Sequence, residues 1–208
     1  MGVIQEQYKE TKVGRVPIDW DVKSLSDLGV FFNGKSIPSS QIKKSGVPII
    51  RYGDLYVQYK TANTITHYAY FIDEENVRDD KLLKKGDVIL ATTGETQEDI
   101  GKAVAYTKND RVFAGGDIMV FRPNIGVLNS EVLSYSLNTG GVANLKSRLG
   151  QGLSIFHLYS SHIEKLLIPL PPLPEQQKIA EILSTVDEQI NTAQAIIDKS
   201  KELKKGLM

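Results

Sequence analysis

The 208-residue sequence contains no cysteine. Disulfide bonds, thiolate metal sites and cysteine nucleophiles are therefore excluded. Histidine occurs only three times, and His157 and His162 are the only two that lie close together in the chain. Two imidazoles without thiolate partners do not make a zinc site, so we expect no metal.

Long hydrophobic runs and an excess of one charge are also missing. No apolar stretch approaches the ~18 residues of a membrane-spanning helix, and the first ten residues lack the pattern of a secretory signal. We therefore expect a cytoplasmic protein without a membrane partner. The 25 basic and 25 acidic residues cancel. Overall charge thus gives no sign of a polyanionic partner, and any contact with nucleic acid must be local.

The motifs of the rival enzyme classes are absent as well. There is no Asn-Pro-Pro-Tyr loop, Gly-x-Gly-x-x-Gly turn, His-Asn-His cluster or Gly-x-Ser-x-Gly elbow. Gly94 and Gly101-Lys102 superficially resemble a phosphate-binding loop, but six residues separate the glycines and three of them are acidic. These absences favour a recognition module without catalytic residues, and a diverged nuclease is the weaker alternative.

The sequence predicts a sharp change of structure near residue 170. Four of the six residues 169–174 are proline, which predicts an extended, stiff segment with Pro174 at the first position of a helix. No glycine or proline then occurs before Gly206. At 1.5 Å per residue, a helix over 175–205 would span about 46 Å, more than the ~30 Å diameter of a small domain.

Apolar or small residues recur along this helix at a 4,3,4,3 spacing, which is typical of a coiled-coil seam. A helix docked on its own domain is the alternative, but the length favours projection and a partner helix. The predicted seam consists of Ile179, Leu183, Val186, Ile190, Ala193 and Ile197, with Ser200 following.

Residues 25–127 alternate short β-like runs with Gly, Asn and Pro, and short helices are expected only near residues 24–28, 79–83 and 131–147. The predicted fold class is α+β: a mixed, β-rich globular domain over residues 1–170, followed by one long coiled-coil-forming helix over 171–208.

Charge and aromatic residues are unevenly distributed within this domain. Residues 33–60 carry five basic side chains against one acid, and five of the nine tyrosines lie between Tyr52 and Tyr70. Lysine attracts phosphate, and Arg, Gln and Tyr can contact base edges. The glycine-rich segment 147–155 adds further donors, although an ordinary loop and solvated lysines would explain the same residues. The candidate DNA-binding residues are Lys35, Lys43, Lys44, Arg51, Tyr52, Tyr56, Lys102, Lys146, Arg148 and Gln151.

One stretch contains, in order, the proline run, the pair Glu175-Gln176 and the start of the helix. It resembles the junction between a recognition domain and its spacer helix in specificity subunits of type I restriction-modification systems. The opening Val16-Pro-Ile-Asp-Trp20 and the Gly-Asp-(hydrophobic) segment from Gly86 are similar to the same family. The resemblance implies a DNA target recognition domain followed by a spacer helix. It further implies no cofactor, and as partners double-stranded DNA, a methyltransferase subunit and a restriction subunit.

Family members usually contain two such units, whereas only one is present in this sequence. We expect either a half-size subunit that forms a homodimer through the helix and reads one half of a bipartite site per copy, or a fragment. The alternative hypothesis is a coiled-coil oligomerisation adaptor whose β-rich domain binds a protein or a glycan.

Overall fold

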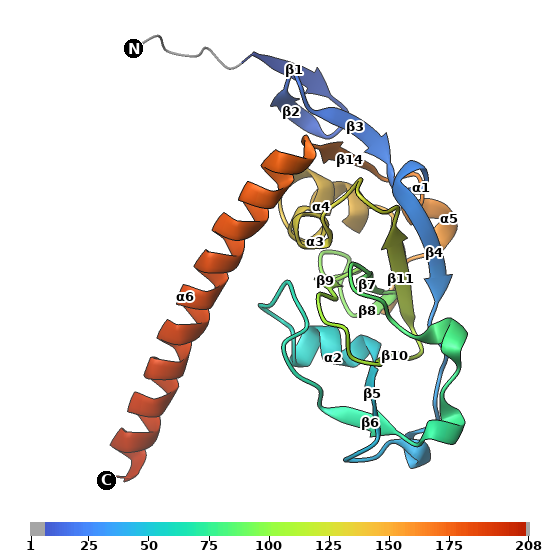
Figure 1. Ribbon diagram of the computed structural model, residues 1–208, viewed down its shortest axis with the longest axis vertical. Coiled ribbons are helices and arrows are strands. Elements are labelled where there is room, and N and C mark those ends of the chain that lie inside the picture. The colour runs from blue at the N-terminus through green and yellow to red at the C-terminus, as the bar shows by residue number, and fades with distance from the viewer. Residues whose placement is uncertain (1–6, 207–208) are drawn as a thin grey trace.

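The computed structural model describes residues 7–206. It shows a mixed helix and strand domain, called the head below, from which one long helix extends, so the predicted fold class is confirmed (Figure 1).

The centre of the head is a four-stranded antiparallel sheet in the order β4-β11-β7-β9. Its strands are β4 (Gly29–Asn33), β11 (Ile118–Pro123), β7 (Val88–Ala91) and β9 (Ala103–Ala105). The two inner strands are apolar at successive positions because both faces of the sheet are covered. On one face, Leu90 and Phe121 pack in a cluster with the helical residue Leu133. On the other, Ile89 and Val120 pack with Leu55.

The covering helices are short. They are α1 (Leu25–Leu28), α2 (Tyr52–Val57), α3 (Ser130–Asn138), α4 (Gly140–Ser147) and α5 (Ser160–Ile163). Three 3-10 turns also occur, over Ser39–Gln41, Glu74–Asn76 and Asp79–Lys81. The predicted single helix over 131–147 is broken at residues 139–140, where Thr139 is extended and Gly140 has a φ of 64°.

A second sheet, in the order β10-β5-β6, lies at the end of the head away from the start of the long helix (Figure 1). It consists of β10 (Phe113–Ala114), β5 (Val47–Ile50) and β6 (Tyr70–Ile72). β5 and β10 are parallel, and the other pair is antiparallel. Ile49, Ile72 and Phe113 form a small core of their own here.

The remaining strands form three small antiparallel assemblies. β1 (Tyr8–Thr11) pairs with β2 (Gly14–Pro17), and β12 (Gln151–Gly152) pairs with β13 (Phe156–His157), which pairs with β8 (Thr93–Gly94). β3 (Asp21–Ser24) pairs with β14 (Leu167–Leu170), so segments from the beginning and the end of the head lie side by side.

The long helix α6 runs from Leu173 to Gly206. It begins one residue before the predicted Pro174, and its 34 residues correspond to about 50 Å. Gln176 and Ala180 are buried against the head, whereas every residue from 188 to 206 is exposed. The predicted projection is confirmed, since only the first few turns of α6 pack on the head (Figure 1).

Candidate nucleic-acid interface

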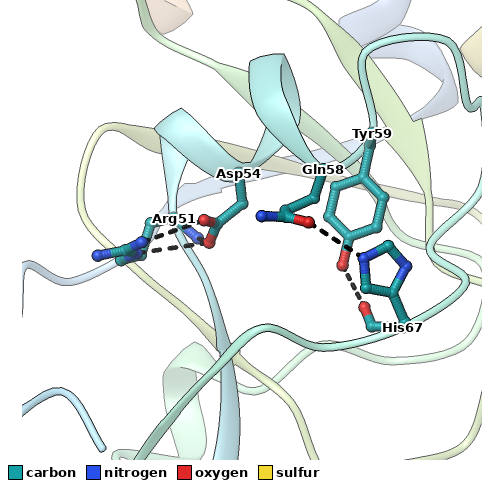
Figure 2. Close-up of polar contacts among 5 residues, drawn as sticks. All are labelled: Arg51, Asp54, Gln58, Tyr59 and His67. Atoms are coloured by element: carbon teal, nitrogen blue, oxygen red, sulfur yellow. Dashed lines mark hydrogen bonds and ion pairs between the residues drawn. The ribbon is translucent and has the colours of Figure 1, made fainter. Parts of the chain in front are cut away.

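Helix α2 begins beside Arg51, where the strand β5 has just ended. The carboxylate of Asp54 accepts the backbone N–H of Arg51 at 2.8 Å and caps the first turn. It also accepts the guanidinium, with Arg51 Nη2 3.2 Å from Asp54 Oδ1 (Figure 2). The guanidinium carbon lies 3.6 Å from the ring centroid of Tyr70. Arg51 is thus held in place on two sides, with its guanidinium at the N-terminal end of α2.

The other end of α2 is fastened to the loop that follows it. Gln58 Oε1 lies 3.3 Å from His67 Nε2, and Tyr59 donates its hydroxyl to the His67 carbonyl (Figure 2). Tyr59 is a core residue rather than a surface residue. The short helix is therefore fixed at both ends, which makes it a rigid platform.

The tyrosines at 52 and 56 take different positions on this platform. Tyr52 is exposed, whereas Tyr56 is half-buried and donates its hydroxyl to the carbonyl of Thr93 at 3.0 Å. Burial, followed by the charge of Asp99, raises the pKa of the Tyr56 phenol, so the proton stays on the hydroxyl. Through this contact α2 adjoins β8. β8 pairs with β13, which in turn pairs with β12, where Gln151 is exposed.

A depression of about 410 Å³ opens beside these elements. It lies among the end of β4, the segment from β7 to β8, the turn before β11, and the segment from β13 to α5. Polar side chains dominate its lining: Asn33, Ser36, Thr92, Thr93, Asp117, His157, Tyr159 and Ser160. The depression is a concave polar surface within the β-rich head.

Two close backbone approaches form the floor of the depression. A Cβ on Gly34 would lie 1.9 Å from the carbonyl oxygen of Gly115, and a Cβ on Gly116 would lie 2.1 Å from Ser36 Oγ. Only glycine fits such spacings. The same close packing places Lys35, which forms a β-bridge with Gly115, at the rim.

The predicted lysines of the Asn33–Lys60 stretch are not equivalent. Lys35 and Lys44 are exposed, and within residues 7–206 no hydrogen bond or ion pair engages their amino groups. Lys43 is exposed but lies 3.3 Å from Asp73. Arg148 is exposed, three residues before Gln151. Free surface cations of this kind can attract phosphate.

Lys102 and Lys146 are placed inside the head instead. Lys102 is largely buried and donates to the carbonyl of Ala62 at 3.0 Å. Lys146 is 3% exposed and donates to the carbonyl of Gly101 at 2.7 Å. Burial, with a contribution from the charge of Lys102, lowers the pKa of Lys146 to about 7. Lys146 is therefore outside the surface that a duplex can touch.

The structure thus brings Lys35, Arg51, Tyr52, Tyr56 and Gln151 to neighbouring elements around the depression, while Lys146 is separated from them by burial. Their assignment to DNA stays a prediction. The sequence did not single out Asp117 or Ser36, which line the depression. The sequence signal that could have indicated them is the Gly115-Gly116-Asp117 turn between two β-like runs.

The start of α6 is anchored by two polar side chains. The indole Nε1 of Trp20 donates to Glu175 Oε2 at 2.9 Å. Gln176, 1% exposed, accepts the backbone N–H of Asn129 at 2.7 Å and donates to the carbonyls of Pro171 and Val127. The Glu-Gln pair of the sequence is thus the joint between head and helix.

A second anchor lies three turns further along α6. Asp187 Oδ2 accepts the hydroxyl of Tyr135 at 2.7 Å and Asn63 Nδ2 at 3.3 Å. Asn63 in turn accepts Asn138 Nδ2 at 2.9 Å. Two anchors along one rod fix its direction relative to the head.

Beyond this second anchor the apolar seam of α6 faces solvent. Val186, Ile190 and Ile197 are 44%, 56% and 47% exposed, and Ala193 is exposed. Ile179 and Leu183 are half-buried near the head. Ile182, Ile196 and Leu203 widen the exposed apolar face. The predicted seam is therefore uncovered over its distal half.

Within residues 7–206 no helix is long and apolar enough to cross a membrane. The same part of the chain holds no cluster of three or more His, Cys, Asp or Glu side chains able to bind a metal ion.

Comparison with known sequences supports the family resemblance of the segment that joins the head to α6. Residues 17–201 match the family described as the type I restriction modification DNA specificity domain. A putative type I restriction enzyme specificity subunit (MjaX) of Methanocaldococcus jannaschii is 30% identical over 207 residues, covering 98% of this chain and 48% of that protein. The EcoKI specificity subunit of Escherichia coli is 21% identical, covering 92% and 41%.

Solved structures share the fold. The HsdS subunit from Thermoanaerobacter tengcongensis is 20% identical with a TM-score of 0.59, covering 85% of this chain and 39% of that chain. The type I restriction-modification S subunit from M. genitalium is 17% identical with a TM-score of 0.61, covering 89% and 43%.

The chain spans about half the length of the curated relatives it matches. The match runs from the segment that leads to Trp20, through the head, to the distal part of α6. The chain belongs to the family of the type I restriction modification DNA specificity domain.

Proposed function

We propose that the head binds one half of a bipartite DNA site and that α6 pairs with a second helix to hold two heads at a fixed separation. The observation that carries the proposal is the family match over residues 17–201. The chain then acts without catalysis of its own, as the recognition subunit of a modification and restriction complex.

The surface of the head supports DNA as the ligand. Lys35, Lys44 and Arg148 present free cationic groups, and Arg51 is oriented by Asp54 and Tyr70. Lysines attract the phosphates of any sequence, and a positioned arginine is suited to bidentate contact with a base edge. Lys35 lies in the chain between Gly34 and Ser36, two residues that line the concave polar surface.

The exposed seam of α6 supports pairing of two helices. An uncovered stripe of isoleucine and valine from Val186 to Ile197, about 17 Å long, is costly in water, and knobs-into-holes packing against another helix would bury it. A second copy of this chain supplies an identical stripe. The resulting homodimer would read a two-fold symmetric, split site.

The methyltransferase subunit and, for cleavage, the restriction subunit would join this assembly and supply the chemistry. The chain itself requires no cofactor in this scheme. The apolar face of distal α6 is wider than a two-helix seam because it includes Ile196 and Leu203. This extra apolar surface could contact those subunits.

Binding to a randomised pool of split DNA sites, measured by electrophoretic shift at about 50 mM and about 200 mM salt, tests the proposal. A DNA reader retains preferred sequences at both concentrations, and its affinity falls steeply as salt rises. Triple replacement of Lys35, Lys44 and Arg148 by Gln should flatten the salt dependence. The same replacement of Lys178, Lys199 and Lys204 on α6 is the matched control.

Binding without any sequence preference, or no DNA binding at all, would contradict the proposal. Affinity for a protein or glycan in place of DNA would favour the adaptor hypothesis. Metal-dependent cleavage by the chain alone would favour the nuclease hypothesis.

A further inference from the structure

We propose that the depression beside β4 and β13 reads one specific base of the half-site, and that Asp117 selects cytosine there by accepting a hydrogen bond from its exocyclic amine. This inference rests on the proposed function and adds a specificity-determining residue to it.

The position of the depression supports this role. Lys35 lies between two of its lining residues, Gly34 and Ser36, and Arg51 lies against Gly115, which adjoins the lining residue Gly116. Cations at the rim can contact phosphates while the polar interior faces the bases. A volume of about 410 Å³ is ample for the edge of a base.

Asp117 is held in an unusual conformation at this site. Its φ of 56° makes it the only residue other than glycine with a positive φ within residues 7–206. The backbone N–H of Thr92 donates to the Asp117 carbonyl at 2.9 Å, and β11 begins at the next residue. Strain of this kind persists where the surrounding structure imposes it, and it occurs often at functional sites.

The Asp117 carboxylate is also free. Its side chain is exposed, and no hydrogen bond or ion pair engages it within residues 7–206. The same holds for the imidazole of His157 across the depression. Asp27, Asp54 and Asp87, by contrast, accept backbone N–H groups or cations. A carboxylate without an internal partner on a concave surface is available to an external donor.

The chemistry of base edges decides which donor fits. An ionised carboxylate accepts hydrogen bonds and donates none. In the major groove guanine and thymine present oxygen acceptors, which repel it, whereas cytosine presents the N4 amine. Adenine also has an amine, but its N7 acceptor lies beside the amine and would face the second carboxylate oxygen. Cytosine is therefore the base that Asp117 selects.

Replacement Asp117→Asn gives the sharpest test, because asparagine tolerates positive φ as aspartate does and keeps the shape of the side chain. The asparagine amide both accepts and donates, which matches adenine N6 and N7. The expected result is a switch: sequences selected from a random pool carry cytosine at one fixed position with the natural chain and adenine there with the variant. Each should prefer its own base by about tenfold or more.

Replacement Glu75→Gln is the matched control. Glu75 is an exposed acid outside the lining of the depression, and it too has no hydrogen bond or ion-pair partner within residues 7–206. Its loss changes the net charge equally, so the control should keep the preference for cytosine.

A second measurement uses the natural chain alone and does not depend on the folding of a variant. In the selected duplex, a cytosine analogue without the 4-amino group at that position should weaken binding by about tenfold, and at other positions it should not. An unchanged base preference in Asp117→Asn, or unchanged affinity for the analogue, would overturn the role of Asp117. Absence of any preferred sequence in the natural chain would instead overturn the proposed function.

Discussion

At the scale of single residues, buried polar groups fix how the head is built. Asp87, fully buried, accepts two hydrogen bonds from the Arg122 guanidinium and one from the backbone N–H of Lys84. Within residues 7–206 no buried side-chain nitrogen or oxygen lacks a partner. Sequence patterns predicted apolar strands in this core but not the pairing of Asp87 with Arg122, because a partner 35 residues away leaves no local signal.

Lys146 gives a prediction about pH. Burial lowers its pKa to about 7, against an ordinary 10.5, so between these values the unfolded chain holds a proton that the folded chain has released. The free energy of unfolding should therefore rise as pH increases through this window. In Lys146→Met this dependence should disappear, and between pH 6 and 9 the difference amounts to roughly 2–3 kcal/mol.

Urea unfolding of the natural chain and of Lys146→Met at pH 6, 7, 8 and 9 measures this effect. Lys165→Met, at an exposed position, serves as the control and should follow the natural chain. Parallel curves for Lys146→Met and the natural chain would contradict the prediction.

Gln176 gives a second prediction at this scale. Gln176→Leu would remove one acceptor and two donors and leave three buried backbone groups at the junction without partners. We expect a loss of about 2 kcal/mol in thermal unfolding. Gln177→Leu, on the exposed side of the same turn, should change stability by less than about 0.5 kcal/mol. Equal effects of the two changes would show that the joint does not depend on these bonds.

At the scale of elements, sequence patterns predicted helices and strands correctly where hydrophobic burial or helix length alone decides the structure. The short β-like runs within residues 25–127 predicted strands where β7 and β11 occur, and the length of the uninterrupted helical segment predicted that α6 projects; the structure has these strands and the projecting helix. Helix α2 was not among the helices predicted from the sequence, because residues such as Tyr52 and Val57 favour strands. The Asp54 carboxylate ends the strand and begins the helix by capping Arg51.

The second anchor of α6 can be tested by Tyr135→Phe, which deletes the hydrogen bond to Asp187 and little else. Stability should fall by about 1–2 kcal/mol, because the bond is to a charged group. Hydrogen exchange should accelerate over residues 180–190 and stay unchanged in β7 and β11. Tyr159→Phe is the control, because the Tyr159 side chain is exposed and its hydroxyl has no hydrogen-bond partner within residues 7–206. Uniform acceleration across the head would contradict a local anchor.

The exposed seam can be tested by the charge substitution Ile190→Glu. A glutamate at this seam position would be buried in the apolar interface of a helix pair, so the protein should become monomeric in light scattering at concentrations where the natural chain forms dimers. Glu188→Lys, two residues away and outside the seam, should leave the molecular mass unchanged. A natural chain that is monomeric at all concentrations tested would refute pairing between copies.

At the scale of the whole molecule, the proposed function requires that α6 sets the distance between two heads, while its two anchors hold it in one direction relative to the head. Inserting one heptad after Ile190 keeps the seam in register and lengthens the rod by about 10 Å, or about three base pairs. The preferred gap between half-sites should increase by that amount in selection from a random pool, while the half-site sequence stays the same. An unchanged gap would show that the length of α6 does not determine the spacing between half-sites.

The whole-molecule arrangement was predictable only in outline. Fold class and projection followed from the proline run and the helix length. The arrangement of the strands in five small sheets did not, because pairs such as β14 with β3 join residues more than 140 positions apart. The grouping of Lys35, Arg51 and Gln151 around one depression likewise depends on tertiary contacts that periodicity does not encode.

The pairing of β3 with β14 has one more consequence. The backbone enters the head and leaves it through neighbouring strands. If residues 21–170 were inserted into a surface loop of another protein, the two ends of the insert would lie on neighbouring strands. The host loop would therefore need to open only by the short distance that an inserted hairpin requires. The two ends of the head therefore meet at one narrow site, a geometry that suits insertion of a domain into another protein.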